Sequence, residues 1–279
     1  MPLALSNSGA TPRHGLTIAF PHSFGRPPVR TKLKRFLREI RGAIALRADL
    51  CRGAPLGDLT RYERSVYSQN GEDGILHAIF ARLGEGTRFF VEFGVEDGAE
   101  CNTRYLAERR GWSGLLMDGE HADSRRNLRR EMITAENVVA LFRTYGVPAA
   151  FDLLSIDIDG NDYWVWRAIA TVWRPRVVVI EYNASEGPDV STSIVYDPAF
   201  VWSETAYMGA SLLALATLAG SHGYTLVACD SRGVNAFFVV DELVAGHFAR
   251  RSVAELYRPP RFRDGGGHPP DPSRRLQPV

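Results

Sequence analysis

The stretch FFVEFGVEDGAECNTRYLAERRGWSGLLMDGE, residues 89–120, decides the fold. It opens with a short apolar run rich in β-forming residues and closes with a second run, GLLMD. A helical segment at 101–110 separates the two runs, so the pattern predicts two parallel strands joined by a crossover helix. Gly94 ends the first strand with a tight turn, and Asp118 ends the second.

The same alternation continues along the chain. Further strands are expected at 132–135, 151–159, 176–183, 224–230 and 235–241, and helices at 71–83, 123–130, 138–145, 162–171 and 211–222. Alternating strands and helices predict an α/β fold with a mostly parallel, Rossmann-like sheet covered on both faces. Only four residues separate the last two strands, which therefore form a C-terminal antiparallel hairpin.

Composition removes several classes of protein. The 279 residues are 45% hydrophobic and 23% charged, as in ordinary globular domains. No GK[ST], HExxH or GxSxG motif occurs, which argues against P-loop nucleotide binding, zinc proteases and serine hydrolases. The three cysteines form no CxxC pair, so we expect a reducing, cytoplasmic setting and no structural zinc. Apolar runs fall short of the roughly 20 residues of a transmembrane segment.

Charge divides the chain unevenly. Residues 1–52 hold ten basic and two acidic residues, net +8, so the remainder carries −7 of the total of +1. We expect an N-terminal tail and helical extension over 1–60, the α/β domain over 61–258, and a disordered tail over 259–279. The basic amphipathic helix at 31–48 either meets an acidic partner or a membrane surface, or packs on the domain with a solvated basic face.

A cofactor site is expected at the carboxyl ends of the strands, where open α/β sheets bind ligands. Asp118 follows Gly94 by 24 residues, the distance at which a Rossmann-like fold places its ribose-binding acid. Glu92 and Asp97 flank the glycine turn and either contact the cofactor or only form the turn. The sequence lacks GxGxxG, which favours a nucleoside ligand without a pyrophosphate over NAD.

Further along the same edge, polar residues follow two neighbouring strands. Asp157 and Asp159 lie two apart after one strand, and Glu181 and Asn183 lie two apart after the next. If these strands are neighbours, the four side chains form an oxygen-rich cluster suited to Mg²⁺ or to a general base. The alternative is that they cap the following helices. Among the histidines, His121 is the best placed as a second candidate for a catalytic base.

Two loops complete the predicted site. The loop YSQNGEDG, residues 67–74, contains Gln69, a candidate for the amino-acid end of the cofactor. Its alternative role is to cap the helix that follows. Residues 184–209, called here the lid segment, are long for a loop in a compact domain and are interpreted as the acceptor-binding lid. The candidate substrate contacts in this segment are Tyr196, Trp202, Glu204 and Tyr207.

Together these motifs carry a family resemblance. The sequences YSQNGEDGIL, FFVEFGVEDG, GWSGLLMDGE, DLLSIDIDGNDYWVW, VVVIEYN and GVNAFFVV resemble the motifs of FkbM-type S-adenosylmethionine-dependent methyltransferases, over about residues 65–245. The resemblance implies a class I methyltransferase fold with Glu92 and Gly94 in the cofactor loop and Asp118 at the ribose. It also implies adenine contacts by Glu136 and Asn137. The family usually has glutamate where Asp118 and Asp159 stand here.

The resemblance implies an O-methyltransferase acting on a sugar or natural product, with S-adenosylmethionine as cofactor and Asp157 or Asp159 as the base. The expected partner is a small-molecule acceptor rather than a nucleic acid, and self-association into a homo-oligomer stays open. The alternative is a non-catalytic Rossmann-like module that docks a partner through its basic N-terminal helix. Fold alone does not decide between the two.

Overall fold

The computed structural model describes residues 29–261 and 266–279. It divides the chain into two compact units, 1–37 and 38–279. The second unit contains the whole α/β domain and the C-terminal half of the helix that we placed in the N-terminal extension. The expected boundary near residue 60 thus lies inside the larger unit.

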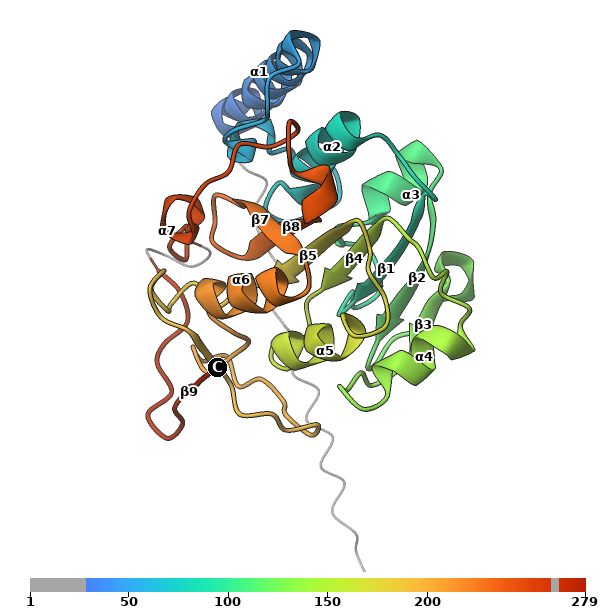
Figure 1. The fold of residues 1–279 in the computed structure, drawn as a ribbon, viewed down its shortest axis with the longest axis vertical. Helices are drawn as coiled ribbons and strands as arrows, with labels where there is room; N and C mark the ends of the chain where they lie inside the picture. Colours follow the sequence, from blue (N-terminus) through green and yellow to red (C-terminus); the bar gives the residue numbers. More distant parts are fainter. Residues whose placement is uncertain (1–28, 262–265) are drawn as a thin grey trace, which may run out of the picture. The chain divides into compact units, whose positions relative to one another are not determined.

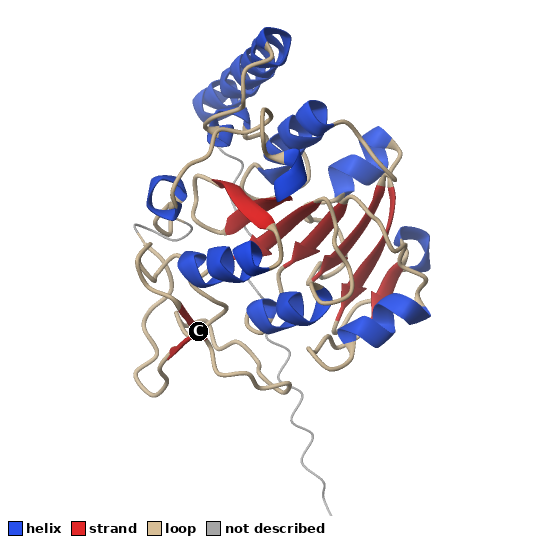
Figure 2. Cartoon of the chain, in the orientation of Figure 1, coloured by secondary structure: helices blue, strands red, loops and turns tan. Residues whose placement is uncertain are grey.

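One sheet organises this unit (Figures 1 and 2). Its seven strands are β1 (Phe89–Phe93), β2 (Ser113–Asp118), β3 (Leu128–Arg130), β4 (Leu153–Ile156), β5 (Val177–Glu181), β7 (Tyr224–Cys229) and β8 (Asn235–Val240). They lie in the order β3-β2-β1-β4-β5-β8-β7, parallel from β3 to β5. Strand β8 runs antiparallel to both β5 and β7. The predicted class I methyltransferase-type fold, a mostly parallel sheet ending in an antiparallel hairpin, is confirmed.

Helices cover both faces of the sheet (Figure 1). The bounds are α1 (Val29–Arg52), α2 (Glu72–Leu83), α3 (Arg104–Arg110), α4 (Val138–Thr144), α5 (Asp162–Ile169), α6 (Leu212–Ser221) and α7 (Val253–Leu256), with 3₁₀ turns η1 (Leu59–Tyr62), η2 (Ser124–Arg126) and η3 (Asp241–Leu243). Apolar residues of α4, α5 and α6 share one core cluster, and those of α1, α2 and α3 share the other. The two-layer covering explains why the central strands are almost wholly apolar.

Alternation along the strands supplies both cores. In β1, Val91 and Phe93 enter the cluster beneath α4 to α6, while Phe90 enters the cluster beneath α1 to α3. In β5, Val178 and Val179 divide in the same way. Side chains on successive strand residues point to opposite faces, so a parallel strand that is covered on both faces is apolar at most of its positions.

Helix α1 is held against the domain from residue 42 onward. Leu46 is buried in the same core cluster as α2. Asp49 Oδ2 accepts a hydrogen bond from the Tyr62 hydroxyl at 2.6 Å. An added Cβ at Gly42 would lie 2.9 Å from the carbonyl oxygen of Arg61, so the helix and the chain before α2 approach closely. The predicted helix is present, and this part of it packs on the domain.

The third strand differs from its prediction. We expected a helix over 123–130 and a strand over 132–135, but the structure has the short turn η2 followed by β3 at Leu128–Arg130. Only Leu128 of β3 is buried, while Arg129 and Arg130 are exposed. An edge strand with a single apolar residue leaves no alternation in the sequence, which is why the pattern pointed to the neighbouring apolar run instead.

The C-terminal segment, residues 266–279, also differs from its expectation as a disordered tail. Its strand β9 (Gln277–Pro278) pairs antiparallel with β6 (Thr192–Ser193) of the lid segment. The Ser191 hydroxyl donates to the carbonyl oxygen of Val279 at 2.7 Å. A segment rich in Pro, Gly and Arg is thereby ordered by backbone pairing with another part of the chain.

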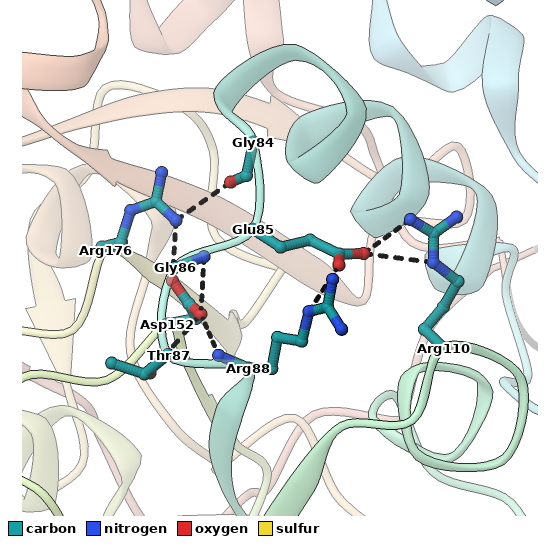
Figure 3. Close-up of polar contacts among 8 residues, drawn as sticks. All are labelled: Gly84, Glu85, Gly86, Thr87, Arg88, Arg110, Asp152 and Arg176. Atoms are coloured by element: carbon teal, nitrogen blue, oxygen red, sulfur yellow. Dashed lines mark hydrogen bonds and ion pairs between the residues drawn. The ribbon is translucent and has the colours of Figure 1, made fainter.

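At the amino ends of the strands, buried charges are fully partnered (Figure 3). Asp152 is completely buried and accepts hydrogen bonds from the backbone N–H of Arg88 at 2.7 Å and from Arg176 Nη1 at 2.7 Å. Glu85 pairs with Arg88 at 2.8 Å and with Arg110 at 2.6 Å. These contacts tie together the starts of β1, β4 and β5. Each buried or half-buried carboxylate at this edge therefore has a cationic partner.

Among the described residues, no helix combines the length and apolar character needed to cross a bilayer.

Candidate functional site

The carboxyl ends of β4 and β5 lie side by side. Ile156 of β4 pairs with Ile180 of β5 in parallel register. Asp157 follows the first and Glu181 the second, so these two acids stand at the same level of the sheet. The predicted adjacency of the two strands is confirmed.

Three of the four predicted metal ligands come together at this point. One carboxylate oxygen from each of Asp157, Asp159 and Glu181 lies within 4.8 Å of the other two. Glu181 Oε2 is buried and has no hydrogen-bond partner among the described residues. A buried acceptor without a donor is rare in native proteins. The arrangement fits a hard divalent cation, which takes oxygen ligands, or a shared proton.

Burial and mutual repulsion set the electrostatics of this acid cluster. Burial, followed by the charge of Asp159, holds the pKa of Asp157 well above its usual range. Burial, followed by the charge of Asp157, does the same to the pKa of Glu181. Burial also raises the pKa of Asp159. The three carboxylates cannot all be ionised side by side without a compensating positive charge.

Asn183, the fourth predicted ligand, bonds to the backbone of the lid segment. Its side-chain Nδ2 donates to the carbonyl oxygens of Ala206 at 2.8 Å and Met208 at 3.1 Å. Its Oδ1 accepts from the backbone N–H of Ser185 at 3.1 Å. This amide joins the two ends of the lid segment, and its role as a metal ligand stays a prediction. Sequence spacing alone had placed it beside Glu181.

Asp162 shapes the loop that contains Asp159. This role was not predicted from the sequence. Its two oxygens accept from the backbone N–H groups of Ile158 and Gly160, both at 2.8 Å. Asp159 between them adopts a left-handed φ of 58°, uncommon for a non-glycine residue. Burial raises the pKa of Asp162 to about 6. An aspartate closing a turn before a helix is the available sequence signal.

The glycine turn after β1 lies directly against the acid cluster. Gly94 has φ +67°, and a Cβ added there would lie 1.5 Å from the carbonyl oxygen of Asp157. Only glycine permits this approach of the β1 turn to the end of β4. Asp97 is exposed, and its Oδ1 accepts from the backbone N–H of Ala99 at 2.8 Å. Of the two interpretations of Asp97, the structure contains the turn, and the cofactor contact stays a prediction.

Glu92 is buried beneath this turn and is fully occupied. Its carboxylate accepts from the backbone N–H groups of Asn102 at 2.8 Å and Thr103 at 3.0 Å, and from the hydroxyl groups of Thr103 and Ser155. Burial raises its pKa despite these bonds. Glu92 fixes the start of α3 to the centre of the sheet. Glu92 thereby positions the predicted cofactor loop, and its own contact with a cofactor stays a prediction.

Asp118 ends β2 as predicted and faces the same loop. Its Oδ2 accepts from the backbone N–H of Glu96 at 2.9 Å, and its Oδ1 from those of Glu120 at 2.9 Å and His121 at 3.0 Å. Burial alone would raise its pKa, but these N–H groups and the His121 ring hold the pKa of Asp118 below its usual range. The carboxylate is thus kept ionised, as a ribose-binding acid must be.

His121 is paired with Asp118 and not with the acid cluster. Its Nδ1 lies 2.9 Å from Asp118 Oδ1, and its side chain is 46% exposed. The hydrogen bond to Asp118 raises the pKa of His121. A raised pKa favours the protonated ring, which does not accept a proton. The catalytic role predicted for His121 stays a prediction, and the geometry supports a partner of the predicted ribose acid.

The loop that contains Gln69 has most of its backbone donors occupied. Asp73 Oδ2 accepts from the N–H groups of Val66, Tyr67 and Ser68 at 2.7, 2.7 and 2.9 Å. These bonds fit the interpretation in which the loop caps the helix that follows, because the three N–H groups are satisfied within the protein. Gln69 itself is exposed, and its cofactor contact stays a prediction.

The predicted adenine region contacts the lid segment. The Tyr196 hydroxyl donates to Glu136 Oε2 and accepts from the backbone N–H of Ala135 at 3.2 Å. Asn137 Oδ1 accepts from the backbone N–H of Thr134 at 2.9 Å and shapes this turn. Tyr196, predicted as a substrate contact, thus joins the lid segment to the residues predicted to hold adenine.

The lid segment lies over the loop that follows β4. Asn161 Nδ2 donates to the carbonyl oxygen of Asp197 at 2.8 Å. The ring of Phe200 lies where a side chain at Gly160 would point, 2.4 Å from an added Cβ. Gly160 is therefore required for the aromatic ring to cover the residue next to Asp159. The segment thus packs on the two residues that follow Asp159, and its role as an acceptor lid stays a prediction.

The remaining predicted substrate residues belong to the outer part of this segment. Tyr207 is buried, and Trp202 Nε1 donates to the carbonyl oxygen of Thr205 at 2.8 Å. Arg274 of the C-terminal segment stacks over Tyr207, with 5.3 Å from Cζ to the ring centroid. The rings of His268 and Trp202 pack edge to face, with 4.6 Å between their centroids. Glu204 is exposed with φ 58°.

Comparisons with known proteins add little to this geometry. No family model and no curated protein matches the sequence. The chain is similar to the crystal structure of magnesium protoporphyrin IX methyltransferase (ChlM) from Synechocystis PCC 6803 with bound SAM, at 10% identity and a TM-score of 0.37. The match covers 77% of this chain and 99% of that one. At this level the comparison carries no conclusion about activity.

Proposed function

We propose that this protein is an S-adenosylmethionine-dependent O-methyltransferase that acts on a hydroxyl group of a small polyhydroxylated molecule, such as a sugar or natural product. One observation supports it above the others. The glycine turn after β1 touches the backbone of Asp157. The predicted cofactor loop and the acid cluster are therefore neighbours, and a ligand on the loop would bring its reactive end to the carboxylates.

The residues present fit the cofactor at two places. Asp118 is kept ionised at the end of β2, which suits acceptance of hydrogen bonds from ribose hydroxyl groups. The turn at 135–137 stands beside the lid segment and would border the adenine. When bound, the cofactor supplies an activated methyl group that needs no further activation by the protein.

The chain itself must orient the acceptor and remove a proton. Asp159 is exposed at the mouth of the acid cluster and has a raised pKa, which makes its carboxylate a better base near neutral pH. Asp159 would accept the proton of the acceptor hydroxyl, and the bound cofactor would supply the methyl group that the acceptor oxygen takes up. Phe200 of the lid segment packs against Gly160, the residue after Asp159.

The orphaned Glu181 Oε2 fits a divalent cation held by Asp157, Asp159 and Glu181. Mg²⁺ at millimolar concentration should raise the Tm of the wild-type protein at pH 8. It should leave the Tm of Glu181→Gln nearly unchanged, because ligand binding stabilises only a fold that holds the site. Ca²⁺ and Na⁺ at equal ionic strength separate a specific effect from screening. An equal Tm shift in both proteins would contradict the metal site.

The cofactor is tested by calorimetric titration with S-adenosylhomocysteine, with NAD as the control ligand. Asp118→Ala should weaken binding by roughly tenfold or more, from the loss of charge-assisted hydrogen bonds. Asp159→Asn should bind normally but lose most of the methyl transfer to a panel of hydroxyl compounds, and Glu108→Gln on the exposed surface of α3 serves as the matched control. Absence of binding in the wild type, with and without Mg²⁺, would favour the non-catalytic docking module instead.

A further inference from the structure

One face of α1 is fixed against the domain, which defines the opposite face. Gly42, Leu46 and Asp49 are spaced by four and three residues and therefore share one side of the helix. This side is the one that meets Arg61 and Tyr62, through the close approach at Gly42 and the hydrogen bond to Asp49. Residues about half a turn away must face outward.

The outward face consists of Ile40, Arg41, Ile44 and Arg47. Ile40 is 41% exposed and Ile44 is 64% exposed, four residues apart on the same side of the helix. Arg41 and Arg47 beside them are also exposed. Single exposed aliphatic residues are ordinary, but two isoleucines one turn apart between arginines form an amphipathic pattern that the α/β domain does not use.

The positive net charge of α1 indicates what kind of surface its outward face can bind. The sequence of α1, residues 29–52, contains eight basic and two acidic residues, net +6. One of the two acids, Asp49, faces the domain and is bonded to Tyr62. A second copy of the helix would meet this charge with the same sign, so self-association through the face is disfavoured. The complementary surface is anionic.

We propose that the outward face of α1 binds the anionic surface of a lipid bilayer, with the helix lying in the plane of the interface. A bilayer surface offers anionic head groups to the arginines and, a few ångströms deeper, an apolar layer to the isoleucines. An acidic protein surface would satisfy the arginines but would leave the isoleucines without a matching layer. The proposal goes beyond methyl transfer and does not depend on it.

Vesicle flotation with the full-length protein tests the proposal. Vesicles of phosphatidylcholine with about 30% phosphatidylglycerol are compared with phosphatidylcholine alone, at low and high salt. We expect binding to the anionic vesicles, and a roughly tenfold or larger loss in both Ile40→Ser/Ile44→Ser and Arg41→Glu/Arg47→Glu. The matched controls are Val172→Ser, 48% exposed on another part of the domain, and the exposed Arg109→Glu; both should bind like the wild type.

A second readout uses Cys51, the exposed cysteine of α1, since Cys101 and Cys229 are buried. An environment-sensitive fluorophore on Cys51 should shift to shorter emission wavelength with anionic vesicles and not with soluble polyglutamate. Unchanged Tm values confirm that the variants are folded.

Three outcomes overturn the proposal. They are no binding to anionic vesicles, binding that survives Ile40→Ser/Ile44→Ser, or binding to polyglutamate in place of vesicles. Self-association lost in the isoleucine variant, without vesicle binding, would assign the face to a second copy of the chain.

Discussion

At the scale of single residues, the buried acids differ in how many hydrogen-bond donors their carboxylate oxygens receive. Glu92 and Asp152 receive several donors each and act as fixed points of the fold. Within residues 29–261 and 266–279, no donor reaches the buried Oε2 of Glu181. An acid that caps backbone N–H groups stabilises a conformation, whereas an acid left unsatisfied costs stability unless a ligand completes it.

Gly94 and Gly111 give a matched pair for testing the contact beneath the cofactor loop. Their φ angles are +67° and +68°, but an added Cβ meets Asp157 at Gly94 and nothing within 4 Å at Gly111. Gly111→Ala should cost about 1–2 kcal/mol of unfolding free energy, from left-handed strain alone. Gly94→Ala should cost at least about 4 kcal/mol, because the backbone of β4 must move. Urea unfolding measures both, and equal losses would show that the close approach is not maintained in solution.

At the scale of elements, the lid segment is held from two sides. Its inner side contacts the loop after β4 through Asn161, and its outer side contacts the C-terminal segment. Ala206 donates its backbone N–H to the carbonyl oxygen of Pro269 at 2.8 Å. Ile194 and Met208 of the segment are buried, and backbone pairing with the C-terminal segment holds its outer side, so part of its local stability depends on this pairing.

Removal of residues 266–279 should therefore loosen the lid segment without unfolding the domain. Amide hydrogen exchange at 191–207 is expected to rise by roughly tenfold or more, because the β6–β9 pairing and the Ala206 bond are lost. The amides of β4 and β5, measured in the same sample, are the internal control and should stay protected. Unchanged exchange at 191–207 would show that the inner contacts alone order the segment.

The elements also show what the sequence could predict. Strands with three or more apolar residues, such as β1, β4 and β5, were located correctly, because burial on both faces leaves a mostly apolar run. Strand β3 was misplaced because one buried leucine gives no pattern. The acid cluster was predicted because parallel register follows from strand adjacency. The bonds of Asn183 to the lid segment were not, because they depend on loop geometry. The order of the C-terminal segment could not be predicted from its own sequence, since it comes from pairing with β6.

At the scale of the whole molecule, the two edges of the sheet differ in charge balance. The amino edge pairs Asp152 with Arg176 and Glu85 with Arg88 and Arg110 (Figure 3). The carboxyl edge gathers acids whose neighbours are other acids. The difference gives the carboxyl edge a negative potential that favours cations, and it makes stability depend on pH.

The pH dependence has a definite sign. Burial raises the folded-state pKa of Asp162 to about 6 and that of Asp230 to about 7. Both values lie above those of the unfolded chain, near 4, so their stabilising contribution is complete below about pH 4 and is lost as pH rises through 6 and 7. Two other groups act in the opposite direction at acid pH. Hydrogen bonds lower the pKa of Asp118 although burial would raise it, and burial lowers the pKa of His77, so both groups reduce stability as the pH falls.

We therefore expect the Tm to be higher at pH 5.5 than at pH 8, by a few degrees. Asp162→Asn should reduce the difference, because the variant no longer titrates at this position. The control is Asp123→Asn. Asp123 is the half-buried N-cap residue of η2, its pKa is lowered, and its loss should leave the slope between pH 5.5 and pH 8 unchanged. A Tm that rises from pH 5.5 to pH 8 would contradict this balance of charges.

The position of β8 between β5 and β7 has a consequence for synthesis. The ribosome releases β7 before β8, yet in the described sheet β7 pairs with β8 alone. Until residue 240 has emerged, the Val177–Ile180 edge of β5 is open, and it is an uncharged, β-branched sequence of the kind that recruits strands from other chains. A nascent or prematurely terminated chain that ends within the hairpin would thus expose the unpaired edge of β5 to aggregation. The pairing of β8 with β5 covers this edge.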